Sequence, residues 1–95
     1  MQLEFTGEMI EWRGPAPFYF VRATEDASER IREIATMVTY GWGVIPATIT
    51  CGNTVWTTSL IPREGRFFVP VKNVARQSAK LELGQMVDLL VEIDI

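Results

Sequence analysis

Hydrophobic and polar residues alternate most clearly along residues 44–61, where two runs rich in threonine, valine and isoleucine flank Gly52-Asn53. A two-residue connection of this kind predicts a β-hairpin, with a turn of type II′ or type I′. Counting outward from the turn predicts one largely apolar face and one polar face. The apolar pairs are Cys51–Thr54, Ile49–Trp56, Ala47–Thr58 and Ile45–Leu60, and the polar-face pairs are Thr50–Val55, Thr48–Thr57 and Pro46–Ser59. A shift of one residue would move Trp56 to the polar face, so the pattern specifies its own register.

Similar patterns predict four further strands. Residues 2–12 alternate, with Gly7 at the point where a bend would let one strand serve two parts of a curved sheet. Residues 18–21 are apolar on both faces, as in a short central strand, and residues 66–71 form another. The last strand carries Val87, Leu89, Val91, Ile93 and Ile95 on one face. Turns are expected at residues 13–17 and 63–65.

Two helices are expected between these strands. Apolar residues recur with helical spacing at Ala27, Ile31, Ile34, Ala35 and Val38, which predicts an amphipathic helix over about 25–38. Either Thr24 or Asp26 can cap it, and Asp26 with Glu29 has capping-box spacing. The helix should end before Gly41, where residues 41–43 form a loop. Asn73 is expected to cap a short helix over about 73–80, closed by Gly84.

Six strands and two helices in 95 residues predict a single mainly β domain over residues 1–95, folded as a small barrel of the double-split type. A flat sheet of this size would leave two long edges exposed, and closure removes them. The N–H group that Pro46 lacks would point away from the strand that contains Ser59. That side of the strand is therefore expected to be unpaired near residue 46.

Composition narrows the chemistry. The chain has one cysteine, Cys51, and no histidine, which excludes an internal disulfide framework and is typical of a reducing cytoplasm. Residues 1–4 lack a basic segment, and no apolar run approaches the ~18 residues of a membrane span. A net charge of −3 does not favour general nucleic-acid binding.

The same residue counts argue against metal and nucleophile chemistry. Structural zinc sites need cysteine and histidine ligands, and Ser–His or Cys–His pairs need histidine. The acidic pairs Glu8/Glu11 and Asp88/Glu92 are interpreted as solvated strand positions, and Cys51 as a core residue. We therefore expect no cofactor, no metal and no catalytic residue.

Two features are candidates for a binding site. Residues 63–80 hold five cations and only Glu64 as an acid, a local charge of +4. They form either a solvated face or an anion site assisted by the amides after Asn73. Trp12 and Trp42 either line the mouth of a pocket or pack in the core. The candidate ligand-binding residues are Arg66, Lys72, Arg76, Lys80, Trp12 and Trp42.

The chain resembles a family of small bacterial and archaeal domains of unknown function that also occurs fused to bacteriocin-protection (OmpD-associated) domains. The resemblance is carried by Gly41-Trp42-Gly43-Val44-Ile45-Pro46, Gly52, Trp56-Thr57-Thr58-Ser59-Leu60 and Phe68-Val69-Pro70-Val71-Lys72. It implies a double-split β-barrel, similar in outline to the swapped-hairpin barrels of dimeric DNA-binding antitoxins. It implies no catalytic residues, and Gln85 replaces the family's usual acid after Gly84.

Three functions are consistent with the sequence. The first is a non-enzymatic cytoplasmic binding or interaction module for a small molecule or a protein, acting as a monomer or homodimer away from the membrane. The second is a nucleic-acid-binding barrel of the swapped-hairpin type, which the local charge favours and the net charge opposes. The third is a histidine-free enzyme that uses acids or a substrate-bound cofactor.

Overall fold

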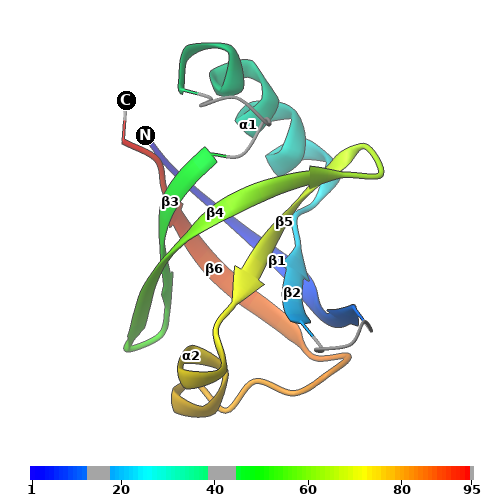
Figure 1. The fold of residues 1–95 in the computed structure, drawn as a ribbon, viewed down its shortest axis with the longest axis vertical. Helices are drawn as coiled ribbons and strands as arrows, with labels where there is room; N and C mark the ends of the chain where they lie inside the picture. Colours follow the sequence, from blue (N-terminus) through cyan, green and yellow to red (C-terminus); the bar gives the residue numbers. More distant parts are fainter. Residues whose placement is uncertain (13–17, 39–44, 95) are drawn as a thin grey trace.

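The computed structural model describes residues 1–12, 18–38 and 45–94, and within them six strands close into an antiparallel barrel (Figure 1). The strand order is β1-β2-β5-β4-β3-β6, and β6 pairs again with β1. The elements are β1 Gln2–Trp12, β2 Phe18–Arg22, α1 Glu25–Val38, β3 Ile45–Cys51, β4 Thr54–Arg63, β5 Arg66–Val71, α2 Asn73–Ser78 and β6 Met86–Glu92. The predicted mainly β barrel with two helices is confirmed. The expected turn at residues 13–17, the loop at 41–43 and Ile95 lie outside the described residues.

The β3–β4 hairpin has the predicted register at all seven pairs, from Ile45↔Leu60 to Cys51↔Thr54. Gly52 has a φ of 59°, whereas Asn53 is not among the described residues with positive φ, which corresponds to type II′. Beyond the hairpin, β3 pairs with β6 only at residues 48–50. The strand is therefore unpaired on that side at Pro46, as expected.

Strand β1 serves both halves of the barrel. Its residues 2–8 pair with β6, and residues 9–12 pair with β2. Gly7 lies next to this changeover, and a Cβ atom placed on it would come within 2.3 Å of the Arg22 carbonyl oxygen. The absence of a side chain at Gly7 therefore allows the backbone at the end of β2 to approach β1 closely.

Helix α1 lies across one end of the barrel, with α2 at the opposite end (Figure 1). The N-cap of α1 is Thr24 rather than Asp26, because Thr24 Oγ1 accepts a hydrogen bond from the Ala27 N–H at 3.1 Å. The predicted stripe is buried at Ala27, Ile31 and Ile34 and half-buried at Ala35, while the Val38 side chain lies outside the described part. No helix within the described ranges is long and apolar enough to cross a membrane.

The prediction that Asn73 caps the second helix is wrong. The extended conformation of β5 continues through Lys72 (φ −67°, ψ 148°), which occupies the N-cap position without a side-chain hydrogen bond. Asn73 is already helical, and the helix ends at Ser78 instead of about residue 80. Lys80 has a left-handed conformation (φ 55°) that does not continue an α-helix, and Gly84 (φ 82°) has the left-handed conformation expected of it.

Trp56 bridges the place where β4 and β5 diverge. These strands pair only at Ile61↔Phe68, Pro62↔Phe67 and Arg63↔Arg66. Farther along β5, the Pro70 carbonyl accepts a hydrogen bond from Trp56 Nε1 at 3.0 Å. Trp56 is buried, as predicted, and its indole satisfies a carbonyl that the strand ladder leaves free.

Candidate functional site

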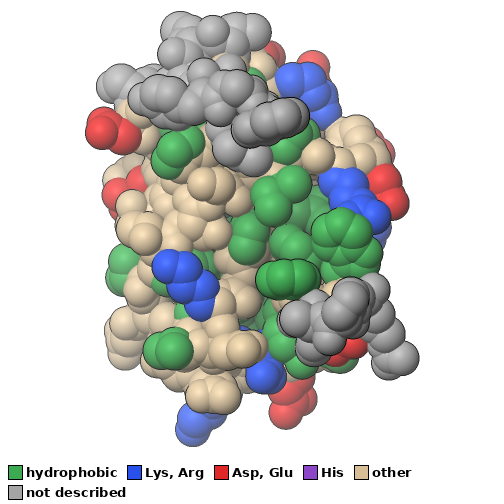
Figure 2. All heavy atoms as spheres, in the orientation of Figure 1, with side chains coloured by type: hydrophobic (Ala, Val, Ile, Leu, Met, Phe, Trp, Pro, Cys, Tyr) green, Lys and Arg blue, Asp and Glu red, His purple; other side chains and the backbone are tan. Residues whose placement is uncertain are grey.

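An aromatic cluster lies on the outside of the barrel, over β1, β2 and β5. Alternation along the paired strands directs Met9 and Val21 into the core. The neighbouring positions on each strand must then point outward. We call this outward cluster the aromatic face, and its members are Trp12, Phe18, Phe20 and Phe68. Figure 2 shows hydrophobic side chains gathered on the side of the molecule where β5 lies in front.

The aromatic face has a buried floor and an exposed rim. Phe20 lies 6.1 Å from Trp12 and 6.0 Å from Phe68 between ring centroids, and Phe20 and Phe68 are only 5% and 8% exposed. Trp12 and Phe18 are 51% and 58% exposed, although they are cross-strand neighbours in the same cluster. The Arg63 guanidinium lies 3.6 Å from the centroid of the Trp12 ring. This distance corresponds to a cation–π contact that orients the indole.

The arginines near the turn between β4 and β5 and near the end of β2 each have a carboxylate partner. The ion pairs are Arg22–Glu8 at 3.8 Å, Arg63–Glu64 at 3.9 Å and Arg66–Glu25 at 3.2 Å. All three pairs are exposed or half-exposed, so each contributes little to stability. They do, however, neutralise the arginine charge at this end of the aromatic face.

The opposite end of the face has cations without such partners. Arg76 on α2 places its guanidinium carbon 4.3 Å from the centroid of the Tyr19 ring, and its Nε atom is buried without a hydrogen-bond acceptor. Lys72, at the N-cap of the same helix, is exposed. Within residues 1–12, 18–38 and 45–94, no carboxylate forms an ion pair with either residue.

The structure does not bring the predicted basic residues together. Arg66 begins β5 and Lys72 follows its last residue, so about 20 Å of extended chain separates them. Arg66 pairs with Glu25 instead, and Lys80 lies beyond the end of α2. Only Lys72 and Arg76 remain on one side of the short helix. Trp42 lies outside the described residues.

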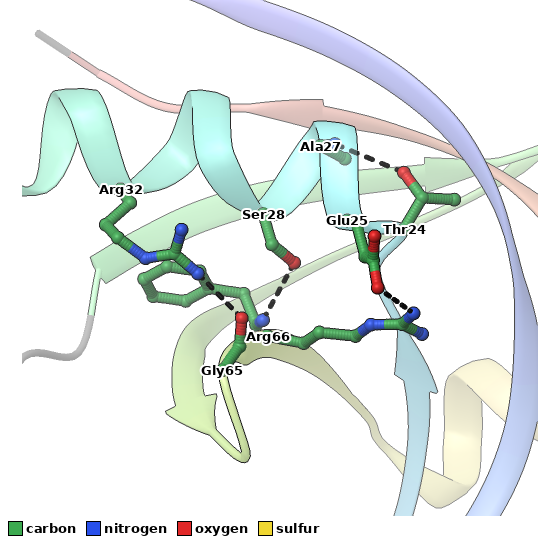
Figure 3. A network of polar contacts seen from close by, with 8 residues as sticks. Thr24, Glu25, Ala27, Ser28, Arg32, Gly65 and Arg66 are labelled. Atoms are coloured by element: carbon green, nitrogen blue, oxygen red, sulfur yellow. Dashed lines mark hydrogen bonds and ion pairs between the residues drawn. The ribbon is translucent and has the colours of Figure 1, made fainter.

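Helix α1 holds the turn between β4, which ends at Arg63, and β5. Figure 3 shows Arg32 and Ser28 of the helix reaching the residues of this turn. Ser28, which is fully buried, accepts a hydrogen bond from the Phe67 N–H at 3.0 Å through its Oγ atom. Arg32 Nη2 donates to the Gly65 carbonyl at 2.6 Å. Because the turn is tied to the helix at these points, the backbone beside Arg63 is held in place and does not belong to a free loop.

Other chemistry is sparse in the described part of the chain. No three residues among its cysteines, aspartates and glutamates are grouped so that they could hold a metal ion. Cys51 is half-buried, and burial, followed by the nearby Asp88 charge, raises the pKa of its thiol. A hollow of about 650 Å³ between β1 and α1 is lined by residues such as Glu4, Thr6 and Asp26, which are polar and exposed.

Three of the four aromatic residues were not predicted as site residues. Trp12 was predicted as a site residue, whereas Phe18, Phe20 and Phe68 were predicted only as strand residues. One signal was available in the sequence, because residues 18–21 are apolar on both faces. A barrel interior can cover only one face of a strand, so the second apolar face had to be covered by a partner element or left at the surface.

The fold and the site together define a class: a small antiparallel β-barrel with an aromatic outer surface. A family model described as "Domain of unknown function (DUF1905)" matches residues 5–91, and the chain belongs to this family. The family match confirms the resemblance to a domain family of unknown function. Comparisons with curated proteins and with solved structures give no match.

Proposed function

We propose that this domain is a non-enzymatic cytoplasmic binding module that contacts a protein partner through its aromatic face. The observation that carries the proposal is the exposure of Trp12 and Phe18 on a floor of buried aromatic rings. Large apolar side chains at the surface forgo stabilisation that burial would provide, about 1.5–3 kcal/mol for a phenylalanine. Clustered exposure of this kind marks interaction surfaces in soluble proteins.

The composition of the face favours a macromolecular partner over a small molecule. The two floor rings pack closely and are nearly inaccessible, so no cavity opens between them. Tryptophan, phenylalanine and arginine are enriched in protein interfaces, and tryptophan and arginine are frequent hot spots. The Trp12–Arg63 stack places these two residue types in contact in the unbound domain. A preordered anchor lowers the entropy lost on binding.

We further propose that family members fused to bacteriocin-protection domains use the same barrel as their binding unit. In this arrangement the barrel would dock a partner, and the fused domain would supply the other activity. A second copy of this chain is the alternative occupant of the aromatic face, since a homodimer would bury the same side chains. The experiment below separates these two occupants.

The test is a selection of peptides from a random display library against the purified domain, followed by calorimetric titration. Selected peptides should bind at least tenfold more weakly to the Trp12→Ser/Phe18→Ser variant. The matched control is Leu83→Ser, which removes an apolar side chain of similar exposure (54%) outside the aromatic face and should leave binding unchanged. Thermal unfolding confirms that both variants are folded.

Two results would contradict the proposal. Peptides that bind the wild type and the Trp12→Ser/Phe18→Ser variant equally would show that the aromatic face is not the binding surface. Sedimentation that shows a wild-type dimer, and a monomer for that variant, would assign the face to a second copy instead.

A further inference from the structure

We infer that the segment recognised by the aromatic face is an acidic protein segment, with carboxylates that contact Lys72 and Arg76 beside apolar side chains that pack on Phe18 and Trp12. This inference rests on the proposed function and specifies the chemistry of its partner. It is carried by where the free cations lie relative to the exposed aromatic rings.

Both cations lie at the end of the face that holds Phe18. In the β2–β5 ladder Tyr19 is opposite Val71, so the next residues outward on the two strands are Phe18 and Lys72. Arg76 lies one turn further along α2, and its guanidinium stacks over Tyr19, whose side chain packs against the core on the other face of β2. Lys72 therefore lies beside Phe18 at the border of the aromatic face, and Arg76 lies next to them at the end of the barrel.

These cations are also the ones whose charge the fold leaves uncompensated at the border of the aromatic face. Arg22, Arg63 and Arg66 have carboxylate partners, whereas Lys72 and Arg76 form no ion pair with the described residues. Arg76 Nε is the one buried side-chain polar atom of the described part without a hydrogen-bond partner. An unpaired, partly buried guanidinium is unfavourable, and a carboxylate from a partner would form charge-assisted hydrogen bonds with it.

A protein segment fits this surface better than a single nucleic-acid strand. Affinity for nucleic acid grows with the number of phosphates neutralised, and among the described residues only two free cations border the face. Near its other end Glu8 and Glu64 pair with Arg22 and Arg63, so these arginines are not free to neutralise further phosphates. A peptide can place carboxylates beside Lys72 and Arg76 and uncharged residues elsewhere.

The experiment compares three fluorescein-labelled probes by fluorescence anisotropy in low salt (on the order of 50 mM) and high salt (on the order of 500 mM). The probes are a 12-residue peptide alternating leucine and glutamate, the same peptide with glutamine for glutamate, and a 12-nucleotide oligothymidine. We expect the glutamate peptide to bind about tenfold more tightly than the glutamine peptide in low salt. High salt should remove most of this difference.

Substitutions locate the charge contact. The Lys72→Gln/Arg76→Gln variant should bind the glutamate peptide about tenfold more weakly than the wild type does, with the affinity expected for the glutamine peptide. The Lys72→Gln variant should show a smaller loss of affinity for the same peptide. Arg30→Gln is the control, because Arg30 is an exposed cation on α1, away from the aromatic face. Thermal unfolding verifies the fold of every variant.

The outcomes distinguish this inference from the proposed function. Equal binding of both peptides, lost in Trp12→Ser/Phe18→Ser, would overturn the preference for acids and leave the aromatic face as the binding surface. If the oligothymidine bound more tightly than either peptide, the partner would be a nucleic acid and the inference of a protein segment would be wrong. Absence of peptide binding up to 1 mM, or an equal loss in Arg30→Gln, would overturn the inference.

Discussion

Replacing Ser28 by alanine should destabilise the domain, because the buried Phe67 N–H loses its hydrogen-bond acceptor. Ser28 is fully buried, and its Oγ atom is the acceptor for the Phe67 N–H. The Phe67 carbonyl accepts from the Ala23 N–H at 2.9 Å, but the chain turns into α1 at Thr24. No backbone carbonyl of β2 therefore continues the ladder to the Phe67 N–H, and the serine hydroxyl substitutes for it. Ser28→Ala leaves this donor unsatisfied where water does not reach.

The magnitude follows from that geometry. A buried unsatisfied N–H group costs about 1–3 kcal/mol. Alanine recovers up to roughly 0.5 kcal/mol through its higher helix propensity. The expected net loss is therefore about 0.5–2.5 kcal/mol. For a domain of this length, that corresponds to a fall in Tm of about 2–20 °C.

The assay is urea and thermal unfolding of the wild type, Ser28→Ala and the control Ser78→Ala. Ser78 is exposed on α2, where its hydroxyl lies 3.2 Å from Thr54 Oγ1. Its substitution should change stability by no more than about 0.5 kcal/mol. If Ser28→Ala unfolds at the same urea concentration as Ser78→Ala, the hydroxyl does not satisfy the Phe67 amide, and the reasoning is refuted.

Three further predictions concern the core and the cysteine. Trp56→Ala should cost about 3–5 kcal/mol in urea unfolding, and Trp56→Phe about 1 kcal/mol or more through loss of the bond to Pro70. A loss below about 1 kcal/mol for the alanine variant would contradict the burial of the indole. Gly7→Ala should destabilise by more than about 1 kcal/mol because its Cβ would clash with the Arg22 carbonyl. If the Gly7→Ala variant had the same Tm as the wild type by circular dichroism, β1 and β2 could move apart at Gly7 without loss of stability, which would contradict this prediction. Cys51 should react with a thiol reagent more slowly in the native domain than in urea at pH 7–8, because its raised pKa lowers the thiolate fraction; rapid native labelling would contradict this.

The sequence allowed prediction where contacts are local. The β3–β4 register follows from the turn residues and the alternation beside them, so every predicted pair was confirmed. The bounds of α1 follow from a stripe within one helix, and they were also confirmed. The cap of α2 was predicted incorrectly because the sequence cannot show that the extended conformation of β5 continues through Lys72.

The candidate site depends on contacts that the order of residues does not contain. Alternation shows that a strand has two faces, but only closure of the barrel decides which face is covered, and closure left Trp12 and Phe18 outside. The segment 63–80 appeared as one basic cluster, yet β5 carries Arg66 and Lys72 to opposite ends of the barrel. The stacking of Arg63 on Trp12 joins strands that are distant in sequence. By itself, then, the sequence determined the strands, α1 and the absence of histidine chemistry. Tertiary structure alone decided the surface, because a side chain's exposure depends on which other strands pack against its own.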